Sequence, residues 1–353
     1  MAKHFSRETK KQQKKRFKRK HRSAYRKKIA RLRKLQQTNI VFQIVHTIHE
    51  LFPDLFDRLR DINEVRKKTS EYEQAELLTA CLAMFLFKEG SRNAMNNDRN
   101  EGKFSQNYRR LFKMRLPHMD TVDEVMRRLN PEELEALKRS LVQTLLARRT
   151  LHKFRFLGQW FVVAVDGTGV MSFSERHCEH CLTKTSKHGK VTYFHNVLEA
   201  KLVCANGFSI SLETEWIENP EGDFKKQDCE RKAFKRLAAH LNQHFPRLPI
   251  CLATDGLYPN QPFFDICRQY HWHFIVTFED GNLPSVWKVV NARHASGLRK
   301  SIEERFQQGK IEYVRTYSWL SKLEYKGHRL QWFDCQEVRH SRENLWNGAT
   351  LCI

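Results

Sequence analysis

Two periodicities of hydrophobic and polar residues divide the chain. Between residues 38 and 150, apolar residues recur every three or four positions, as in NIVFQIVHTIHELF and EYEQAELLTACLAMFLF, which is typical of amphipathic helices. From Gln159 onward they form short runs rich in Val, Ile and Phe, which favour strands. We therefore predict a helical domain over residues 37–155, followed by a sheet domain. In the second helical run, six residues are predicted to form one buried face: Leu77, Leu78, Cys81, Leu82, Phe85 and Leu86.

Local signals inside the helical domain predict where some helices begin. Thr121 followed by Glu124 has the spacing of a capping box, and Asn130 before Pro131 combines an N-cap residue with a first-turn proline, so we expect a helix to begin at each point. The polar, Asn-rich stretch SRNAMNNDRNEGKFSQNYRRLFKMRLP is interpreted as a connector between helices or as a DNA contact.

The sheet domain has a readable order of elements. QWFVVAVDGTG, VLEAKLVC and FSISLETEWI are predicted strands, and the Asn206-Gly207 pair between the last two favours a tight hairpin. DFKKQDCERKAFKRLAAHLNQHF has helical spacing, PICLATDGL is a predicted strand, NQPFFDICRQY a helix and HFIVTF a strand. The predicted fold class is therefore α/β, a mixed sheet with the order βββαβαβ in residues 156–290. Residues 291–353 contain one expected helix, LRKSIEERFQQ, and then three strand-like pieces, IEYVRTYSWL, LEYKGH and RLQWFDCQEV.

The net charge of the chain is strongly positive, at +23, from 63 Lys and Arg against 40 Asp and Glu. Basic residues concentrate in residues 1–36, where Glu8 is the sole acid. This balance favours a polyanionic partner, so we predict a basic tail over residues 1–36 that contacts DNA phosphates, with Lys14, Lys15 and Arg16 as candidates. A solubilising or ribosome-adhering tail without specific contacts is the alternative.

The sequence also bears on location. No apolar run approaches the roughly 20 residues of a membrane span, and the N-terminus lacks an apolar signal core, so we predict a cytoplasmic protein without a membrane partner. Nine cysteines at irregular spacing fit reduced thiols better than a disulfide framework.

Two aspartates are the strongest candidates for chemistry. Asp166 in VVAVDGTG and Asp255 in CLATDGLYPNQPFF each end a predicted buried strand and precede a glycine. Acids at the carboxyl ends of neighbouring strands meet at one edge of a sheet, where their repulsion is relieved by a hard divalent cation such as Mg²⁺. Taken singly, each aspartate could instead be a turn residue or a helix N-cap.

The order of elements around Asp166 and Asp255 resembles the ribonuclease H-like catalytic core of IS4-type DDE transposases. VVAVDGTG is similar to the first-aspartate strand of that family, and CLATDGLYPNQPFFDICRQYHWHFIVTFEDGNLPSVW to its second-aspartate region. The resemblance covers residues 35–340 in layout. It implies a bacterial, nucleoid-associated insertion-sequence enzyme in which the two aspartates hold Mg²⁺ or Mn²⁺. Such enzymes cut double-stranded DNA at terminal inverted repeats and join it to target DNA, as a homodimer on DNA, and their helical region and basic tail contact the DNA.

One departure from the family pattern concerns the third carboxylate. In the family it is a Glu on a late helix, within a signature whose Arg lies three residues after a Tyr. No tyrosine after Asp255 has an arginine at that spacing. Residues 291–353 look like the β-rich insertion that precedes this helix, so we interpret the chain as C-terminally truncated and expect cutting and joining to be severely impaired. Glu303, Glu304 and Glu337 remain as substitutes, although a solvent-exposed face explains the first two adequately.

A second group of potential ligands lies in RHCEHCLTKTSKHGKVTYFH. Cys178 and Cys181 have a spacing found in zinc sites. Zinc ligation is therefore chemically possible. No second well-spaced cysteine pair follows, and His195 falls in the next predicted strand, so we favour incidental thiols in a basic active-site loop over a zinc site. Four residues of this loop are candidate DNA phosphate contacts: Lys184, Lys187, His188 and Lys190.

Three functions are consistent with these patterns. The first is a DDE transposase that cleaves and transfers DNA strands. The second is a non-catalytic DNA-binding remnant that competes for element ends with a full-length enzyme. The third is a cellular ribonuclease H-like nuclease acting on RNA–DNA hybrids, which the helical domain and basic tail make less consistent with the sequence.

Overall fold

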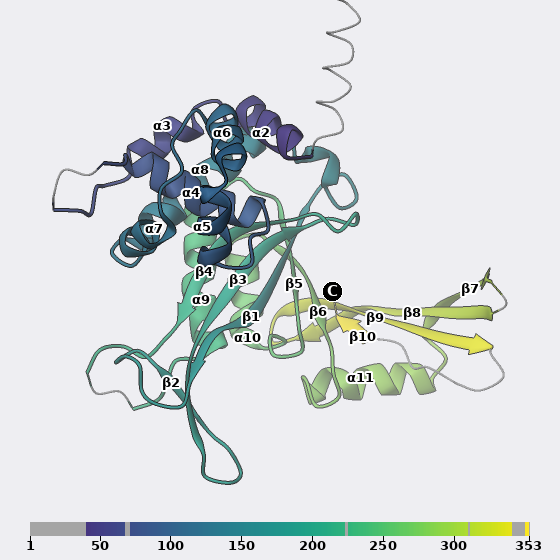
Figure 1. Cartoon of the computed structure of the whole chain (residues 1–353). Helices are drawn as coiled ribbons and strands as arrows, with labels where there is room; N and C mark the ends of the chain where they lie inside the picture. Colours follow the sequence, from purple (N-terminus) through teal and green to yellow (C-terminus); the bar gives the residue numbers. More distant parts are fainter. Residues whose placement is uncertain (1–39, 68–70, 223–224, 310, 341–349, 353) are drawn as a thin grey trace, which may run out of the picture. The chain divides into compact units, whose positions relative to one another are not determined.

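The computed structural model describes residues 40–67, 71–222, 225–309, 311–340 and 350–352. The chain forms two units that divide between Leu137 and Lys138, within one helix, and Figure 1 traces both of them. This division falls upstream of the boundary predicted at residues 155–156. The predicted basic tail lies outside the described residues.

The first unit consists of helices, as the periodicity predicts. In its described residues these are α2 (Ile40–Leu51), α3 (Leu55–Arg60), α4 (Gln74–Leu86), α5 (Arg92–Asn100), α6 (Gly102–Phe112), α7 (Met119–Met126) and the first half of α8 (Pro131–Ala147). Their core contains large, fully buried side chains from successive helices: Leu59, Leu77, Met95, Tyr108 and Met119. The predicted start of α8 is confirmed, because Asn130 Oδ1 accepts a hydrogen bond from Glu132 N at 3.0 Å.

A buried carboxylate ties the start of α4 to the segment before α7. Glu76 accepts hydrogen bonds from Arg115 N at 2.9 Å, from Arg115 Nε at 3.0 Å and from Arg115 Nη2 at 2.8 Å, and from Glu73 N at 3.1 Å. Burial opposes ionisation of Glu76, but the hydrogen bonds from Arg115 outweigh it and hold the pKa of Glu76 below its usual range. A carboxylate satisfied by charge-assisted hydrogen bonds is a strong tertiary link.

The predicted buried face of α4 is only partly correct. Leu77 is buried as expected, but Leu82 is 45% exposed and Phe85 is 70% exposed. Ala80 and Ala83 are fully buried instead. Small side chains on the inner face let neighbouring helices approach closely. The close approach leaves no room there for the larger residues toward the end of α4, which face outward.

Tertiary contacts also override two local signals. The helix α7 begins at Met119 with His118 as its N-cap residue, so the start predicted at Thr121 is wrong. Asn96 Oδ1 accepts the Met119 backbone N–H at 2.8 Å, which satisfies a donor at the helix start from another helix. The Asn-rich stretch interpreted as a connector forms α5 and α6, and Ser91 caps α5.

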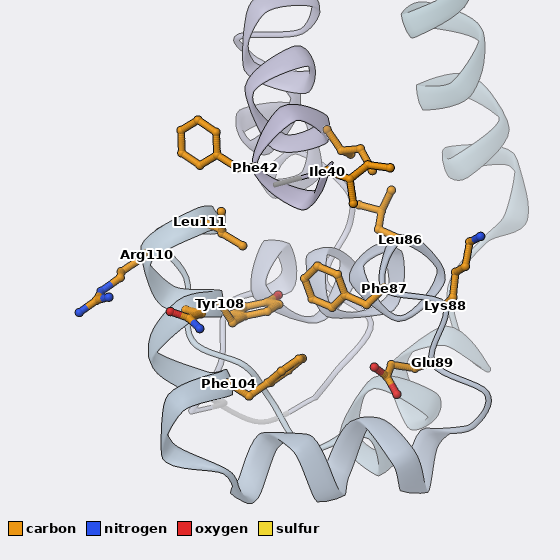
Figure 2. A pocket seen from close by; sticks show the side chains of 12 residues that line it. Ile40, Phe42, Leu86, Phe87, Lys88, Glu89, Phe104, Tyr108, Arg110 and Leu111 are labelled. Atoms are coloured by element: carbon orange, nitrogen blue, oxygen red, sulfur yellow. The ribbon is translucent and has the colours of Figure 1, made fainter. Parts of the chain in front are cut away.

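An apolar cavity of about 830 Å³ lies within the first unit, lined by α2, the end of α4 and α6. Figure 2 shows Phe104 and Tyr108 of α6 along one side of it, with Phe87 and the α2 residues Ile40 and Phe42 nearby. The Tyr108 hydroxyl is buried without a hydrogen-bond partner, and burial, followed by the charge of Glu76, raises its pKa. The lining is mainly aromatic and aliphatic, with charged residues such as Lys88, Glu89 and Arg110 as well.

The second unit has mixed α/β architecture built on one sheet. Its described strands are β1 (Phe161–Phe173), β2 (Leu182–Thr185), β3 (Val191–Val203), β4 (Ser209–Ile217), β5 (Ile250–Thr254), β6 (His273–Thr277), β7 (Lys300–Gln308), β8 (Ile311–Tyr325), β9 (His328–His340) and β10 (Thr350–Cys352). Their order is β2-β3-β1-β5-β6-β10-β9-β8-β7, and β4 also pairs with β3. The helices are α9 (Glu230–His244), α10 (Gln261–Gln269), α11 (Pro284–Ala295) and the short 3-10 helix η1 (His152–Phe154), as labelled in part in Figure 1.

The pairing of β1 organises this sheet. β1 pairs antiparallel with β3 and parallel with β5, and β5 pairs parallel with β6. The predicted order βββαβαβ therefore appears as β1, β3, β4, α9, β5, α10 and β6, with β2 as an additional short strand. The Asn206-Gly207 turn is confirmed, since Gly207 joins β3 to β4 with a φ of 82° that glycine adopts without strain.

The segment after β6 differs from its prediction. The expected helix LRKSIEERFQQ is wrong, because Lys300–Gln308 forms β7, paired with β8. Cross-strand contacts explain the change: the Phe306 ring stacks on Tyr313 at 5.1 Å, and Tyr317 donates a hydrogen bond to Glu304 at 3.0 Å. Such pairs stabilise strands beyond local propensity. The helix α11 was not predicted, whereas the predicted strand pieces form β8 and β9.

A buried carboxylate links three elements of the second unit. Glu213 on β4 is 3% exposed and accepts hydrogen bonds from Arg139 Nε of α8 at 3.0 Å and from His244 Nδ1 at the end of α9 at 2.7 Å. A buried charge is tolerated when partners satisfy it, and removing one partner is strongly destabilising.

We predict that Arg139→Met lowers the free energy of unfolding of the second unit by about 3 kcal/mol, because it leaves a buried charge undercompensated. Urea unfolding of the full chain measures this loss. The double variant Arg139→Met, Glu213→Met should be more stable than the single variant. Arg305→Met removes an exposed pair with Glu303 and should lower the free energy of unfolding far less, because solvent screens an exposed pair. Equal losses for Arg139→Met and Arg305→Met would contradict the prediction.

Candidate metal centres

Asp166 and Asp255 lie at equivalent positions of two parallel neighbours. Ala164 of β1 pairs with Ala253 of β5, so each aspartate lies two residues beyond the last paired position. Both are exposed at the carboxyl edge of this strand pair, and Asp255 Oδ1 accepts a hydrogen bond from Leu257 N at 3.0 Å. The register therefore brings the two predicted residues to one edge of the sheet.

Glu230 adds a third carboxylate to this edge. It is the first residue of α9, and its side chain lies over Gly167, where an added methyl group would come within 2.6 Å of the Glu230 carboxyl carbon. Burial, followed by the charges of Asp255 and Asp166, raises the pKa of Glu230. The glycine after Asp166 thus leaves room for the Glu230 carboxyl group, which would have to move if a larger residue stood there.

The surroundings of these three acids contain an unsatisfied hydroxyl. Tyr258 is 1% exposed, and its hydroxyl has no hydrogen-bond partner. Burial, followed by the charges of Glu230, Asp255 and Asp166, raises the pKa of Tyr258. Among the described residues, neither Asp166 nor Glu230 forms an ion pair. Like charges beside an unpartnered hydroxyl form an oxygen-rich site that suits a hard divalent cation.

The glutamates considered as substitutes do not belong to this site. Glu303 and Glu304 lie on β7, where they bond to Arg305 and to the Tyr317 hydroxyl. Glu337 on β9 bonds to Arg315 and Arg339, and the Arg315 hydrogen bond, as the largest favourable contribution, holds its pKa below the usual range. These three acids are engaged on the β7–β9 part of the sheet.

A second cluster contains two thiols and an imidazole. His195 Nε2 lies 3.3 Å from Cys178 Sγ and 3.3 Å from Cys181 Sγ, and the two sulfurs are 3.7 Å apart. Among the described residues this is the only set of at least three His, Cys, Asp or Glu side chains whose ligand atoms all lie within 4.8 Å of one another. The three carboxylates around Asp166 are less tightly gathered.

The expectation that His195 is separated from the cysteines by lying in the next strand is wrong. β2 pairs antiparallel with β3, so the chain folds back after Cys181 and places His195 of β3 beside the cysteine pair. His195 and Cys181 are both buried. Burial raises the pKa of Cys178, whereas for Cys181 the raising effect of burial is outweighed by hydrogen bonds from the Cys178 and His177 backbones, which lower its pKa.

Asn219 joins the thiol cluster to the start of α9. Its Nδ2 donates to Cys181 O at 2.9 Å, and its Oδ1 accepts from Asp228 N at 3.2 Å. Gln227 binds both backbone groups of Thr183 in β2, accepting from N at 2.6 Å and donating to O at 3.1 Å. The segment leading into Glu230 is therefore held by the β2–β3 hairpin.

The basic loop residues occupy exposed positions on that hairpin. Lys184 lies in β2 and borders a hollow of about 530 Å³ over the far half of β1. Lys187, His188 and Lys190 are exposed in the β2–β3 turn. The tail candidates Lys14, Lys15 and Arg16 lie outside the described residues.

A second hollow, of about 310 Å³, shares Tyr258 with the surroundings of the three acids. Tyr258 lines it together with four basic residues of the segment before α9 and of α9 itself: Lys226, Arg231, Lys232 and Lys235. Cations beside a carboxylate cluster are the combination expected where a phosphodiester approaches a metal site.

Glu230 and this basic hollow were missed by sequence reasoning. The helix was predicted from Asp223, whereas α9 begins at Glu230. The prediction therefore placed Glu230 in the middle of a helix, although it is the first helical residue. A usable signal is present, since Glu230 continues the buried stripe of Ala233, Phe234 and Leu237 at helical spacing. An acid in line with a buried face is unusual enough to mark a site.

Comparison of the chain with models of protein families and with curated proteins finds no match. None of the described helices is long and apolar enough to cross a membrane. The functional assignment therefore depends on the geometry of the two clusters in this chain.

The raised pKa of Glu230 gives a pH-dependent stability with a definite sign. The folded state binds the proton more tightly than the unfolded state, so stability is lost as the pH rises from the ordinary glutamate range through the raised folded pKa. At neutral pH in EDTA, we predict that Glu230→Gln raises the midpoint of thermal unfolding by a few degrees. Mn²⁺ should stabilise the wild type but not the variant.

Differential scanning fluorimetry of the full chain checks this, with Glu132→Gln as the control. Glu132 is an exposed first-turn glutamate of α8, and its substitution should not raise the midpoint. A wild-type midpoint that Mn²⁺ leaves unchanged would count against metal binding at Glu230.

Proposed function

We propose that the chain is a metal-dependent DNA-processing enzyme of the DDE transposase type, in which Asp166, Glu230 and Asp255 hold Mg²⁺ or Mn²⁺. The observation that carries this proposal is the convergence of three carboxylates at one edge of the sheet. The Glu230 carboxyl group lies over Gly167, next to Asp166, and the register of β1 and β5 brings Asp255 to the same edge, near the unpartnered Tyr258 hydroxyl. Carboxylate oxygens on neighbouring elements are the ligands that these cations prefer.

The sheet supports a ribonuclease H-like core. β4, β3 and β1 form an antiparallel block, β5 and β6 continue it in parallel, and α9 and α10 provide the connections. Asp166 and Asp255 lie at the carboxyl edge of the central parallel pair, where open α/β sheets bind ligands. This arrangement agrees with the order expected from the resemblance to IS4-type transposases.

The third carboxylate is where the proposal departs from the family pattern. The resemblance implies a glutamate on a late helix, but the Glu230 carboxyl group at the start of α9 lies over Gly167, the residue after Asp166. Burial, followed by the charges of Asp255 and Asp166, raises the pKa of Glu230. We propose that Glu230 supplies the third ligand. With Glu230 in that role, the missing signature does not abolish the site.

The chemistry follows from the site and its rim. A divalent cation held there activates a water or a 3′-hydroxyl for in-line attack at phosphorus and stabilises the leaving oxygen. Lys226, Arg231 and Lys232 line a hollow that shares Tyr258 with the surroundings of the three acids and would bind the phosphates on one side of the scissile bond. Lys184 and the β2–β3 turn would bind the DNA backbone farther along β1, and the helical unit and basic tail would hold the transposon ends.

The setting of this activity follows the resemblance. The substrate would be double-stranded DNA with terminal inverted repeats, and two copies of the chain would act together because two ends must be joined. The protein would work in the bacterial cytoplasm, associated with the nucleoid.

Plasmid nicking tests the catalytic site. We expect the wild type to convert supercoiled DNA to open circles with Mg²⁺ or Mn²⁺, and Asp166→Asn, Asp255→Asn and Glu230→Gln each to lower the rate by roughly a hundredfold or more. Asp280→Asn, which changes an exposed acid outside the site, should leave the rate unchanged. DNA binding must be measured in parallel to show that the variants still engage the substrate.

The outcomes separate the alternatives. Binding without cutting by the wild type would favour a DNA-binding remnant over an enzyme. Cleavage of RNA–DNA hybrids in preference to duplex DNA would favour a cellular nuclease. Full activity in Glu230→Gln, with loss in Asp166→Asn, would show that another group provides the third ligand.

The basic hairpin makes a separate prediction for DNA affinity. Changing Lys184, Lys187 and Lys190 together to Gln should weaken binding and reduce the slope of log K against log salt by roughly 0.9 for each phosphate that is no longer neutralised. Fluorescence anisotropy with labelled duplex at several salt concentrations measures this. The matched control changes three exposed lysines of the β7–β9 region, Lys300, Lys322 and Lys326. An equal effect of both triple variants would mean that total charge, and not the hairpin, governs binding.

A further inference from the structure

We propose that Cys178, Cys181 and His195 bind one zinc ion, which fastens the loop between β1 and β2 to β3. This site is separate from the carboxylate site in ligand chemistry, because thiolate and imidazole ligands select zinc over Mg²⁺. It does not depend on the proposed nuclease activity.

The distances fit tetrahedral zinc. Zinc bonds of about 2.3 Å to sulfur and about 2.0–2.1 Å to nitrogen place two sulfurs about 3.8 Å apart and a sulfur and a nitrogen about 3.6 Å apart. The two sulfurs here are 3.7 Å apart, and His195 Nε2 is 3.3 Å from each. A shift of a few tenths of an ångström in one imidazole ring would complete the geometry.

The rival explanations fit less well. A disulfide requires an S–S length of about 2.05 Å, far below the observed separation, and both thiols are free. A simple hydrogen-bonded trio would not require both sulfurs to face the same imidazole nitrogen, since that nitrogen accepts or donates one strong hydrogen bond.

Binding would proceed with a defined proton balance. The two thiols each release a proton to solvent and bind as thiolates, and neutral His195 binds through Nε2 with its proton on Nδ1. No fourth His, Cys, Asp or Glu side chain in the described residues joins the set, so a water molecule would complete the coordination.

The second layer of contacts supports a built site. Asn219 is 2% exposed and fixes the backbone on both sides of the second cysteine, through Cys181 O at 2.9 Å and through His180 O, which accepts from Asn219 N at 3.1 Å. Hydrogen bonds of this kind hold metal ligands in position before the ion arrives. The loop also closes on β1 through the Phe173 and His177 rings, stacked at 4.4 Å.

The test is metal analysis of the full chain purified under reducing conditions without added chelator. Mass spectrometry of the metal content should give about one zinc per chain. Cys178→Ser, Cys181→Ser and His195→Gln should each weaken zinc binding by at least about a hundredfold, because loss of second-layer partners alone costs up to that factor. Cys204→Ser and Cys335→Ser, at half-buried thiols outside the cluster, should retain the zinc.

Cobalt substitution provides a readout that does not depend on the stability of a variant. Apo wild type titrated with Co²⁺ should show the visible absorption of tetrahedral cobalt and a near-ultraviolet thiolate charge-transfer band, which falls to about half in Cys178→Ser, where one of two thiolates remains. Absence of stoichiometric zinc together with absence of these bands in the wild type would overturn the proposal. So would zinc retained in full by Cys178→Ser and His195→Gln. Neither readout uses DNA cleavage, so an inactive chain would not mask the result.

Discussion

The register of β1 is the constraint on which the second unit depends. This strand pairs along its length with β3 and, in its first four residues, with β5, so one residue of slippage would turn every side chain to the opposite face of the sheet. Val163 and Val165 would leave the core, and Asp166 would lose its position opposite the end of β5. The pairing of β1 with β3 shifts its register once, at a bulge between Gly169 and Met171. Beyond the bulge, Met171 pairs with His195 of the thiol cluster.

Carboxylates gathered without ion pairs of their own work against folding, so other contacts must hold them together. Glu230 remains close to the aspartates because the start of α9 is fixed from several directions. Arg236 in the next turns of α9 hydrogen bonds with Asp228 and Glu215 and with Trp216 O, and the inner face of the helix is buried in the core. An unfavourable arrangement maintained by the scaffold in this way is characteristic of a functional site.

The sequence predicted most of what local patterns determine. Helical spacing, the Asn206-Gly207 turn, the buried strand segments before Asp166 and Asp255 and the α/β order all depend on short stretches of chain. The predicted end of the first strand at Asp166 is wrong, because β1 continues to Phe173 along β3. The errors involve long-range contacts. Lys300–Gln308 is a strand because β8 supplies its partners. Periodicity contains no information about which distant side chains will meet, so the metal ligands from different elements could not be assembled from it.

Asn219 links the two candidate metal centres. Through one side chain it connects the backbone of Cys181 to that of Asp228, two residues before Glu230. If an ion at the thiol cluster orders this segment, less conformational entropy is lost when a second ion binds at the carboxylates, so the second ion binds more tightly. Such coupling is reciprocal: an ion at the carboxylates would strengthen binding at the thiol cluster by the same free energy. Each centre would then change the metal affinity of the other without any change of fold.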